Sequence, residues 1–361
     1  MPALSPTADA VAALVLAGAL SVGLTPIAIR LAHRTGMLDH PSGHKGHARA
    51  TPLLGGMSVI MALVATVAVF APSGWLLPCI LLAVLLGIGT IDDRVGLSPQ
   101  LRVVVTAAAA AALSLGSLGW TVFDQGVLDL LITVAFVLAA VNAINLMDNL
   151  DGAAATVIGV TGLVLGAFDL AQGATGAAVL GFALAGSCAG FLVFNLRRPA
   201  RIFLGDGGSM PLGMALALLI MGTPGPMSEP GGGALGLGLI LVVVLLVGLP
   251  AFDTALVIRS RVRRSVSVLT GGRDHLTHRL LPVLGSPQRV ALALAITQAL
   301  ILLLAIGVYQ LDESVAIPVT VAIMALAALA IERLDGRLQM NQSRWRLGSG
   351  FSRTSTTRER S

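Results

Sequence analysis

Long apolar stretches limit what this chain can fold into more than any other feature of its sequence. A helix needs roughly 20 apolar residues to cross a bilayer, and eleven stretches approach or reach that length. Charged residues make up only 11% of the 361 residues, whereas soluble domains carry about 25%. We therefore predict an all-α, polytopic integral membrane protein with about eleven transmembrane helices. The candidate spans are residues 10–32, 54–71, 75–91, 102–119, 127–147, 153–170, 174–194, 208–223, 234–258, 289–309 and 314–331.

The basic residues predict how these spans are oriented. With eleven spans, all 23 Lys and Arg residues fall in loops on one side of the membrane, and the opposite loops contain none. Basic loops stay in the cytoplasm, so we expect the N-terminus outside and the C-terminus inside. The basic stretches are residues 30–49, 94–102, 197–201, 259–289 and 333–360.

We expect one transmembrane domain over residues 1–335, followed by a basic tail over residues 336–361. The tail is mostly polar and is predicted to be disordered. The polar motifs considered below fall in the expected cytoplasmic loops of the domain. These loops are residues 33–53, 92–101, 148–152, 195–207 and 259–288.

Six carboxylates lie at the cytoplasmic ends of predicted spans, where a charge beside hydrocarbon is costly unless something compensates it. Asp148 and Asp151 are three residues apart and would share a face if they lay on a helix, a spacing that Asn142 and Asn145 extend upstream. Oxygen ligands at the membrane surface, without a His/Cys set, suit Mg²⁺. The six are Asp92, Asp93, Asp148, Asp151, Asp206 and Asp253.

Histidine and lysine are concentrated in the same loops. All six histidines occur in HRTGMLDHPSGHKGH at 33–47 and DHLTH at 274–278, and histidine is the usual acid–base group beside a phosphate. Lys45 is the only lysine beside 22 arginines, which indicates a position that needs a compact ammonium. A phosphate contact is the natural candidate, and an ordinary surface lysine is the alternative.

Glycines begin two of the predicted spans. Gly55 and Gly56 start the second span, and Gly207, Gly208 and Ser209 follow a carboxylate in FLGDGGS. Glycine permits close backbone approach, and a helix N-terminus offers N–H groups to an anion. The FLGDGGS layout could hold a metal ion and a phosphate together.

Taken together, these stretches resemble the polyprenyl-phosphate N-acetylhexosamine-1-phosphate transferase superfamily (glycosyltransferase family 4). The segments HKGHARATPLLGG at 44–56 and DDRVGLSPQLR at 92–102 are similar to its Lys-x-His…Gly-Gly loop and its Asp-Asp motif. NAINLMDNLDG at 142–152 and NLRRPARIFLGDGGS at 195–209 match two further signatures. PAFDT and GRDHLTHRL resemble its late Asp and His motifs. The motifs occur in the family's order from about residue 40 to residue 280.

Three positions depart from the family pattern. Asn149 stands where a Gly usually follows the first Asp, Thr277 interrupts the commoner run of histidines, and His44 replaces an Arg before the lysine. The chain also lacks the acidic aromatic stretch that follows the His-rich loop in MraY-type enzymes. It is therefore more similar to the WecA- and TagO-type N-acetylglucosamine-1-phosphate transferases. The resemblance does not assign the loop that binds the sugar.

The resemblance implies a reaction. N-acetylhexosamine-1-phosphate, most simply GlcNAc-1-phosphate, would pass from a UDP-sugar to polyprenyl (undecaprenyl or decaprenyl) phosphate, releasing UMP. Mg²⁺, with Mn²⁺ able to replace it, would neutralise the two anionic reactants. The expected partners are the UDP-N-acetylhexosamine, the polyprenyl phosphate and the bilayer, with a homodimer left open and no nucleic acid. The setting would be a bacterial plasma membrane, with a cytoplasmic active site that begins a cell-envelope polysaccharide.

The resemblance also implies roles for individual residues. Asp206, and then Asp92, are the expected metal ligands. Asp93 would act as a base or as a nucleophile; because a lipid phosphate is largely dianionic near pH 7, we favour direct attack by the lipid. The expected catalytic set is Asp92, Asp93, Lys45, His275 and His278. The expected substrate-binding set is His47, Asn145, Asp148, Asp151, Asn195, Ser209, Asp253 and Arg273.

Two other functions compete with this one. The first is an MraY-type phospho-MurNAc-pentapeptide transferase of peptidoglycan synthesis, which shares the motifs. The second, from another class, is a cation-coupled transporter or lipid flippase. A transporter would place its carboxylates near the middle of the bilayer on broken helices, whereas these lie at the cytoplasmic rim.

Overall fold

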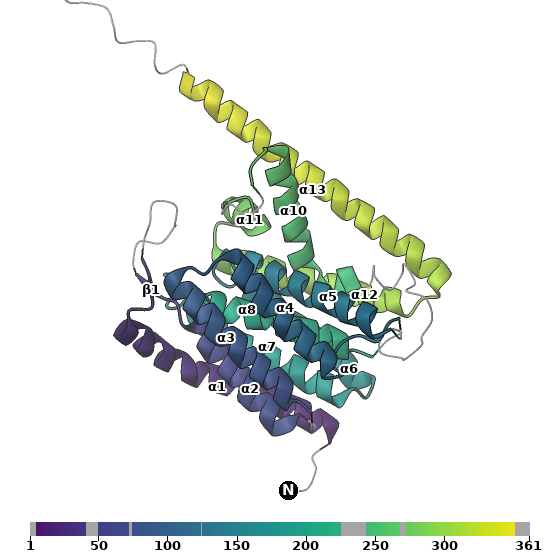
Figure 1. The fold of residues 1–361 in the computed structure, drawn as a ribbon. Coiled ribbons are helices and arrows are strands. Elements are labelled where there is room, and N and C mark those ends of the chain that lie inside the picture. The colour runs from purple at the N-terminus through teal and green to yellow at the C-terminus, as the bar shows by residue number, and fades with distance from the viewer. Residues whose placement is uncertain are drawn as a thin grey trace, which may run out of the picture.

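The computed structural model describes residues 5–40, 50–71, 74–123, 125–224, 243–267 and 272–350, leaving aside the side chains of residues 313 and 336–350. Helices make up most of this part of the chain, as the sequence predicts (Figure 1). The first eight are α1 (Pro6–Thr35), α2 (Gly55–Phe70), α3 (Leu76–Val95), α4 (Pro99–Leu115), α5 (Gly126–Met147), α6 (Ala153–Ala171), α7 (Thr175–Asn195) and α8 (Asp206–Gly222). The later ones are α10 (Leu249–Arg263), α11 (Leu276–Leu284), α12 (Pro287–Tyr309) and α13 (Glu313–Gly350).

The described helices fit a multi-pass membrane protein. Seven of them are long and apolar enough to cross a membrane, namely α1, α3, α5, α6, α7, α12 and the first part of α13. Three more apolar helices, α2, α4 and α8, have 16 or 17 residues. Each of these ten coincides with a predicted span. The remaining predicted span, residues 234–258, begins outside the described residues, and α10 covers only its end.

Helix α8 lies inside the bundle because its side chains are apolar or small. Every residue from Gly207 to Met221 is buried, and the helix packs against α2, α3, α5, α6 and α7. Asp206 is the first residue of this enclosed helix. The sequence therefore places a carboxylate where several neighbouring helices also end.

Glycines let the ends of α2, α3 and α8 meet. A Cβ on Gly56 would lie 2.2 Å from the backbone N of Gly208, and a Cβ on Gly89 would lie 2.3 Å from the backbone O of Asp206. Backbone atoms cannot accommodate a methyl group at such distances, so any larger residue would push these helices apart. The close backbone approach predicted for the glycines of α2 and α8 is confirmed.

Two short strands, which the sequence did not predict, follow α1. Strand β1 (Leu38–Asp39) pairs antiparallel with β2 (Thr51–Pro52). Gly36, in the left-handed region with φ of 71°, ends α1 and turns the chain into β1. Two residues per strand give no alternating pattern that a sequence could reveal.

The segment after β2 is joined to the loop before α8 by the backbone. The N–H of Phe203 donates to the O of Pro52 (2.8 Å), and those of Gly55 and Gly56 donate to the O atoms of Phe203 and Leu204 (3.0 and 2.9 Å). The N–H groups at the start of α2 are thus used inside the protein. They are not available to an anion, contrary to the expectation for a helix N-terminus at this Gly-Gly pair.

Helices α10 and α11 lie to one side of the α1–α8 bundle, and α13 runs past α10 (Figure 1). A helical segment over residues 243–247 precedes α10. The helix is interrupted at Gly248, whose φ is 60°. The sequence predicts a disordered tail from residue 336, but α13 continues to Gly350. Residues 337–347 contain no Pro or Gly and are rich in Leu, Gln and Arg, which favour helix. Residues 351–361 lie outside the described residues.

Candidate active site

Asp93 joins the end of α3 to the start of α8. Its Oδ1 accepts a hydrogen bond from the backbone N of Asp206 (2.9 Å), and its Oδ2 accepts one from the backbone N of Gly207 (3.1 Å). A carboxylate at this position satisfies N–H groups that a helix start leaves unpaired, and it interacts favourably with the helix dipole. These two N–H groups are therefore already paired within the protein, and the expectation that FLGDGGS holds a metal ion and a phosphate together stays a prediction.

Asp206 lies where α4, α5 and α8 meet. The Nδ2 atom of Asn145 donates to Oδ1 of Asp206 (2.7 Å) and to Oγ of Ser209 (2.9 Å). Nη1 of Arg102 lies 3.1 Å from the other carboxylate oxygen, Oδ2. The structure thus brings together three residues that the sequence assigned to one site, from segments far apart in the chain.

Arg102 connects the second expected metal ligand to the first. Its Nη1 atom lies 3.0 Å from Oδ2 of Asp92 and 3.1 Å from Oδ2 of Asp206. Asp92 is buried, and its Oδ1 accepts a hydrogen bond from the backbone N of Leu97 (2.6 Å). Two carboxylate oxygens from different helices therefore converge on a single cationic nitrogen.

Sequence reasoning missed Arg102 as a site residue. It was grouped with the arginines that set membrane orientation, because the sequence shows no difference in chemistry among them. The signal that could have found it is its place in the first turn of α4, at the end of the segment that resembles the Asp-Asp motif. A short connection between α3 and α4 forces that turn to face the end of α3.

Asp148 follows α5 and lies among other carboxylates. Burial raises the pKa of Asp148 well above its usual range, and the negative charges of Asp206, Asp93 and Asp151 raise it further. A hydrogen bond from the backbone of Gly205 acts in the opposite direction. Negative charge is therefore in excess here, which favours a cation. We refer to Asp92, Asp93, Asp148 and Asp206 as the carboxylate cluster.

The carboxylate cluster fits a hard divalent cation that takes few protein ligands. Oδ2 of Asp92 is buried and lacks a hydrogen bond of good geometry within the described residues, although Arg102 lies 3.0 Å away. Those residues contain no group of three or more His, Cys, Asp or Glu side chains arranged for a metal. Mg²⁺ commonly takes only one or two carboxylates and completes its shell with water and substrate phosphates. Asp92 and Asp206 could therefore hold Mg²⁺ between them.

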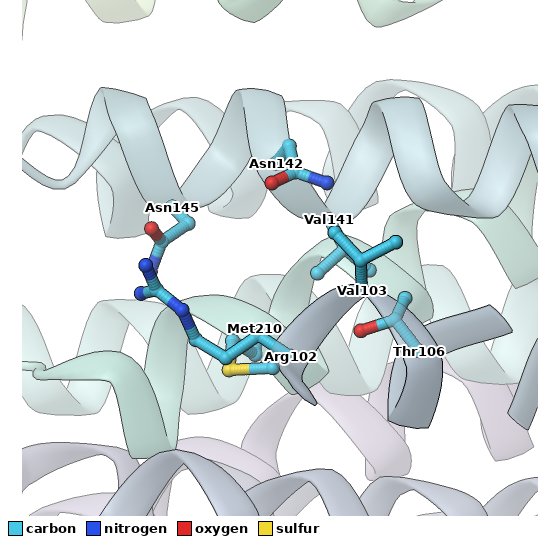
Figure 2. A pocket seen from close by; sticks show the side chains of 7 residues that line it. All are labelled: Arg102, Val103, Thr106, Val141, Asn142, Asn145 and Met210. Carbon is cyan, nitrogen blue, oxygen red and sulfur yellow. The ribbon is translucent and has the colours of Figure 1, made fainter. Parts of the chain in front are cut away.

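A small pocket of about 20 Å³ opens beside the carboxylate cluster, between α4, α5 and α8. Figure 2 shows Arg102 and Asn145 pointing toward one another at one end of it. Val103, Val141 and Met210 supply apolar surface, and Thr106 and Asn142 complete the lining. One polar, cationic end and an apolar remainder suit an amphiphilic ligand.

Asp253 orients His275 on the other side of the site. Its Oδ2 lies 2.8 Å from Nδ1 of His275, and its Oδ1 accepts a hydrogen bond from the backbone N of Leu276 (2.6 Å). Both side chains are buried. This contact turns Nδ1 of His275 toward Asp253 and leaves Nε2 facing away from it. The structure thus gives Asp253 a positioning role, and its predicted contact with substrate stays a prediction.

His278 lies beside His275, with ring centroids 6.3 Å apart. Burial lowers the pKa of His278, and the charges of His275 and Arg273 lower it further, while Asp253 and Asp274 act in the opposite direction. His278 is therefore neutral near pH 7 and able to accept a proton. The two histidines assigned to catalysis do lie together, on the first turn of α11.

Asp274 attaches the start of α11 to α10. Nε and Nη2 of Arg261 donate to Oδ2 and Oδ1 of Asp274 (2.9 and 3.1 Å), and Nη2 of Arg264 lies 2.7 Å from Oδ2. Burial alone would raise the pKa of Asp274, but the hydrogen bonds and charges of the two arginines outweigh it and lower that pKa. A two-pronged pairing of this kind fixes orientation as well as charge.

Asn195 is buried and joins two loops. Its Oδ1 accepts a hydrogen bond from the backbone N of Gly152 (2.6 Å), and its Nδ2 donates to the backbone O of Ile202 (2.8 Å). These bonds hold the turn that contains Asp148 and Asp151 against the loop before α8. Asn195 therefore positions the site; the substrate contacts assigned to Asn195 and Asp151 stay predictions.

Lys45 and His47 fall within residues 41–49, outside the described residues. Their assignments, like the catalytic and binding roles of the described residues, stay predictions. Strands β1 and β2, which precede and follow these residues in the sequence, pair with each other.

Comparison with known proteins identifies the family. Residues 75–223 match the family model for glycosyl transferase family 4. Over 299 residues the chain is 34% identical to the decaprenyl-phosphate N-acetylglucosaminephosphotransferase of Mycobacterium tuberculosis, covering 73% of each chain. The chain belongs to glycosyl transferase family 4.

Two other relatives have similar names. The chain is 29% identical over 276 residues to the probable undecaprenyl-phosphate N-acetylglucosaminyl 1-phosphate transferase of Bacillus subtilis, covering 72% of this chain and 73% of the relative. It is 29% identical over 297 residues to the undecaprenyl-phosphate alpha-N-acetylglucosaminyl 1-phosphate transferase of Escherichia coli, covering 77% and 78%. The resemblance to the WecA/TagO type is confirmed. The family 4 match contains the carboxylate cluster, whereas Asp253, His275 and His278 lie beyond it.

Proposed function

We propose that this protein transfers GlcNAc-1-phosphate from UDP-GlcNAc to a polyprenyl phosphate, giving polyprenyl-diphospho-GlcNAc and UMP. One observation carries the proposal: side chains from α3, α4 and α5, namely Asp93, Arg102 and Asn145, converge on Asp206 of α8. They do so in a chain whose relatives are named as polyprenyl-phosphate N-acetylglucosamine-1-phosphate transferases. A site that joins two anionic phosphates needs concentrated, well-oriented charge, and this arrangement supports that chemistry.

Asp206 and Asp92 would hold Mg²⁺, or Mn²⁺ in its place. When bound, the ion would neutralise and polarise the diphosphate of the donor. Asn145 holds the side chain of Asp206 and Asp93 holds its backbone, so the carboxylate is oriented in advance. Arg102 supplies a second positive charge for phosphate oxygens beside these ligands.

The acceptor would attack the donor directly. An oxygen of the polyprenyl phosphate forms a bond to the β-phosphorus of UDP-GlcNAc as the bond from that phosphorus to the bridging oxygen breaks, and UMP leaves. Both oxygens of Asp93 accept backbone hydrogen bonds from the start of α8, so both are already engaged in holding that helix. We therefore assign Asp93 to positioning α8 rather than to a covalent intermediate.

The pocket between α4, α5 and α8 offers a place for the acceptor. Its phosphate would lie near Arg102 and Asn145, and its first isoprene units would pack against Val103 and Val141. An apolar chain leaving between helices can continue into lipid without crossing a polar surface.

We also propose that eleven spans place the N-terminus outside and the C-terminus and active site in the cytoplasm, in a bacterial inner membrane. The distribution of all 23 Lys and Arg residues supports this orientation. The bacterial origin of the relatives supports the setting.

The test is UMP release by the purified protein in detergent. With UDP-GlcNAc, decaprenyl or undecaprenyl phosphate, and Mg²⁺, we expect UMP together with a lipid-linked sugar; EDTA should stop the reaction, and added Mg²⁺ or Mn²⁺ should restore it. UDP-MurNAc-pentapeptide, tested in parallel, should give none. UMP from the pentapeptide nucleotide alone would overturn the choice of donor, and a transporter or flippase would release no UMP from any nucleotide.

Variants tie the reaction to the carboxylate cluster. Asp206→Ala and Asp93→Asn should each lower turnover by about 100-fold or more, whereas Glu332→Gln, at an exposed ion pair away from the site, should keep wild-type rates. Wild-type rates in a folded Asp206→Ala protein would refute the site. UMP released stoichiometrically without acceptor would establish a covalent route instead.

A further inference from the structure

Two of the three positions where this sequence departs from the family pattern contact each other. Oγ1 of Thr277 donates a hydrogen bond to Oδ1 of Asn149, across 128 residues of chain. Asn149 lies in the turn after α5, and Thr277 lies in the first turn of α11. Departures that meet in this way behave as one unit, because each residue supplies what the other needs.

The contact is directional, and its Thr277 side is enclosed. Thr277 is fully buried (0% exposed), so its hydroxyl depends on a protein acceptor. The amide of Asn149 is fixed because Nδ2 donates to the backbone O of Leu146 (2.7 Å), which turns Oδ1 toward the hydroxyl. Removing one partner would leave a polar atom of the other unpaired, and this costs more than the net value of the bond.

The pair connects the two halves of the site. Asn149 directly follows Asp148 of the carboxylate cluster, and Thr277 lies between the two histidines of α11. On its other side the same turn of α11 is held by Asp253 of α10. The first turn of α11 is therefore fixed at two points, one of which belongs to the segment that carries the carboxylates.

Neither residue of the pair lines the pocket proposed for the acceptor. Asn142 and Asn145 line that pocket between α4, α5 and α8 (Figure 2). Asn149, past the end of α5, instead reaches α11. A change at the pair thus alters the histidine side of the site and leaves the lining of the pocket intact.

We propose that Asn149 and Thr277 are a positioning pair that sets the separation between the carboxylate cluster and the histidines of α11, and thereby the affinity for the nucleotide-sugar donor. This inference rests on the proposed transferase reaction. A donor whose diphosphate is bound near Asp92 and Asp206 has its remaining groups free to reach α11. The acceptor, bound in a pocket lined by α4, α5 and α8 and by no residue of α11, does not depend on where α11 lies.

The test separates donor affinity from acceptor affinity. Thr277→Val keeps the shape of the side chain and removes the hydroxyl, so the KM and the calorimetric Kd for UDP-GlcNAc should rise about tenfold. The KM for undecaprenyl phosphate should stay within about twofold of wild type. Thr277→Ser, which retains the hydroxyl, should restore donor affinity. A variant that is only partly misfolded would have fewer active molecules. Its kcat would fall, and the donor KM would not rise relative to the acceptor KM.

A double-mutant cycle tests whether the two residues act together. Asn149→Ala should raise the donor KM about as much as Thr277→Val, and the double variant should be no worse than either single one. Asn149→Gly with Thr277→His, the residue types of the family pattern, should bind the donor better than each of these changes alone. Thr66→Val is the matched control, because Thr66 is a buried threonine whose hydroxyl bonds to its own helix (2.8 Å to the O of Ala62); its donor KM should not change.

Several outcomes would overturn the positioning pair. They are an unchanged donor Kd in both single variants, equal increases in donor and acceptor KM, or additive effects in the double variant. If the wild-type protein neither binds UDP-GlcNAc nor releases UMP, the proposed function itself fails. If the wild type does both and Thr277→Val behaves like it, only the positioning pair fails.

Discussion

Arg102 lies between the two carboxylates, Asp92 and Asp206, that are expected to bind a metal ion. Its Nη1 atom lies 3.0 Å from Asp92 and 3.1 Å from Asp206, so it competes with a divalent ion for the same oxygens. Arg102→Gln removes this competition. We expect the half-saturating Mg²⁺ concentration to fall about tenfold, while turnover falls because a charge beside the phosphates is lost.

A Mg²⁺ titration of UMP release measures both effects in one experiment. Arg94→Gln is the control, because Arg94 is exposed and donates to the backbone O of Thr35 (3.4 Å); it should change neither value. A higher Mg²⁺ requirement in Arg102→Gln would contradict competition and would mean that Arg102 helps to organise the ligands.

At the scale of residues, the sequence predicted which chemical groups form the site better than it predicted which of them contact each other. Carboxylates at span ends indicated a charged site, and Asp206, Asn145 and Ser209 do lie together. The sequence could not separate Arg102 from other arginines, since the difference arises only when α4 packs beside α3. It also could not show that Asp93 binds backbone N–H groups, because that bond depends on where α8 begins.

At the scale of helices, α13 braces α10 and α11 through Asp335. This buried carboxylate lies 3.3 Å from Nη1 of Arg263 and 3.9 Å from Nη2 of Arg279. Neither Nη atom of Arg279 has a hydrogen-bond partner within the described residues, so Asp335 is the main compensation for its charge. Asp335→Asn should lower the free energy of unfolding by about 2 kcal/mol, seen as a lower Tm in detergent. Glu332→Gln, in an exposed pair with Arg259, should leave Tm unchanged.

The link between α10 and α11 also predicts a pH dependence. The pKa of Asp274 is lower in the folded protein than in the unfolded chain, because its arginine partners outweigh the effect of burial. Its contribution to stability is thus present above about pH 4 and is lost as pH falls through the lower folded pKa. Wild-type Tm should drop more steeply between about pH 5 and pH 3 than that of Asp274→Asn. Parallel curves for the two proteins would show that Asp274 contributes no such dependence.

The helices themselves were largely predictable, and the exceptions have physical causes. Apolar length reveals a membrane span, so ten predicted spans coincide with helices. Helix α11 is a short element whose place is fixed by Asp253, Asp274 and Asn149, and such tertiary bonds leave no periodic signal. The extension of α13 was missed because polar composition was read as disorder, although its residues favour helix.

At the scale of the whole molecule, the sequence predicted that the motifs share one face, and the structure shows how their helices come together. Charge distribution and motif order indicated a common site, but its geometry depends on how closely α2, α3 and α8 pack. That packing is controlled by glycines, whose importance is visible only when the neighbouring backbone is known. Gly89 and Gly87 lie two residues apart on α3. Replacing each in turn distinguishes the loss of a close helix contact from the loss of a glycine as such.

A Cβ on Gly89 would lie 2.3 Å from the backbone O of Asp206 and 2.6 Å from the backbone N of Gly207, whereas one on Gly87 would meet nothing within 4 Å. Gly89→Ala must therefore push the start of α8 away from α3, breaking the bonds that Asp93 makes there. We expect transferase turnover to fall about 100-fold or more, because misplacement of about 1 Å can cost that much. Gly87→Ala adds the same methyl group to the same helix and should keep both turnover and Tm. Equal activity in the two variants would mean that the close contact of α3 with α8 does not set the geometry of the site.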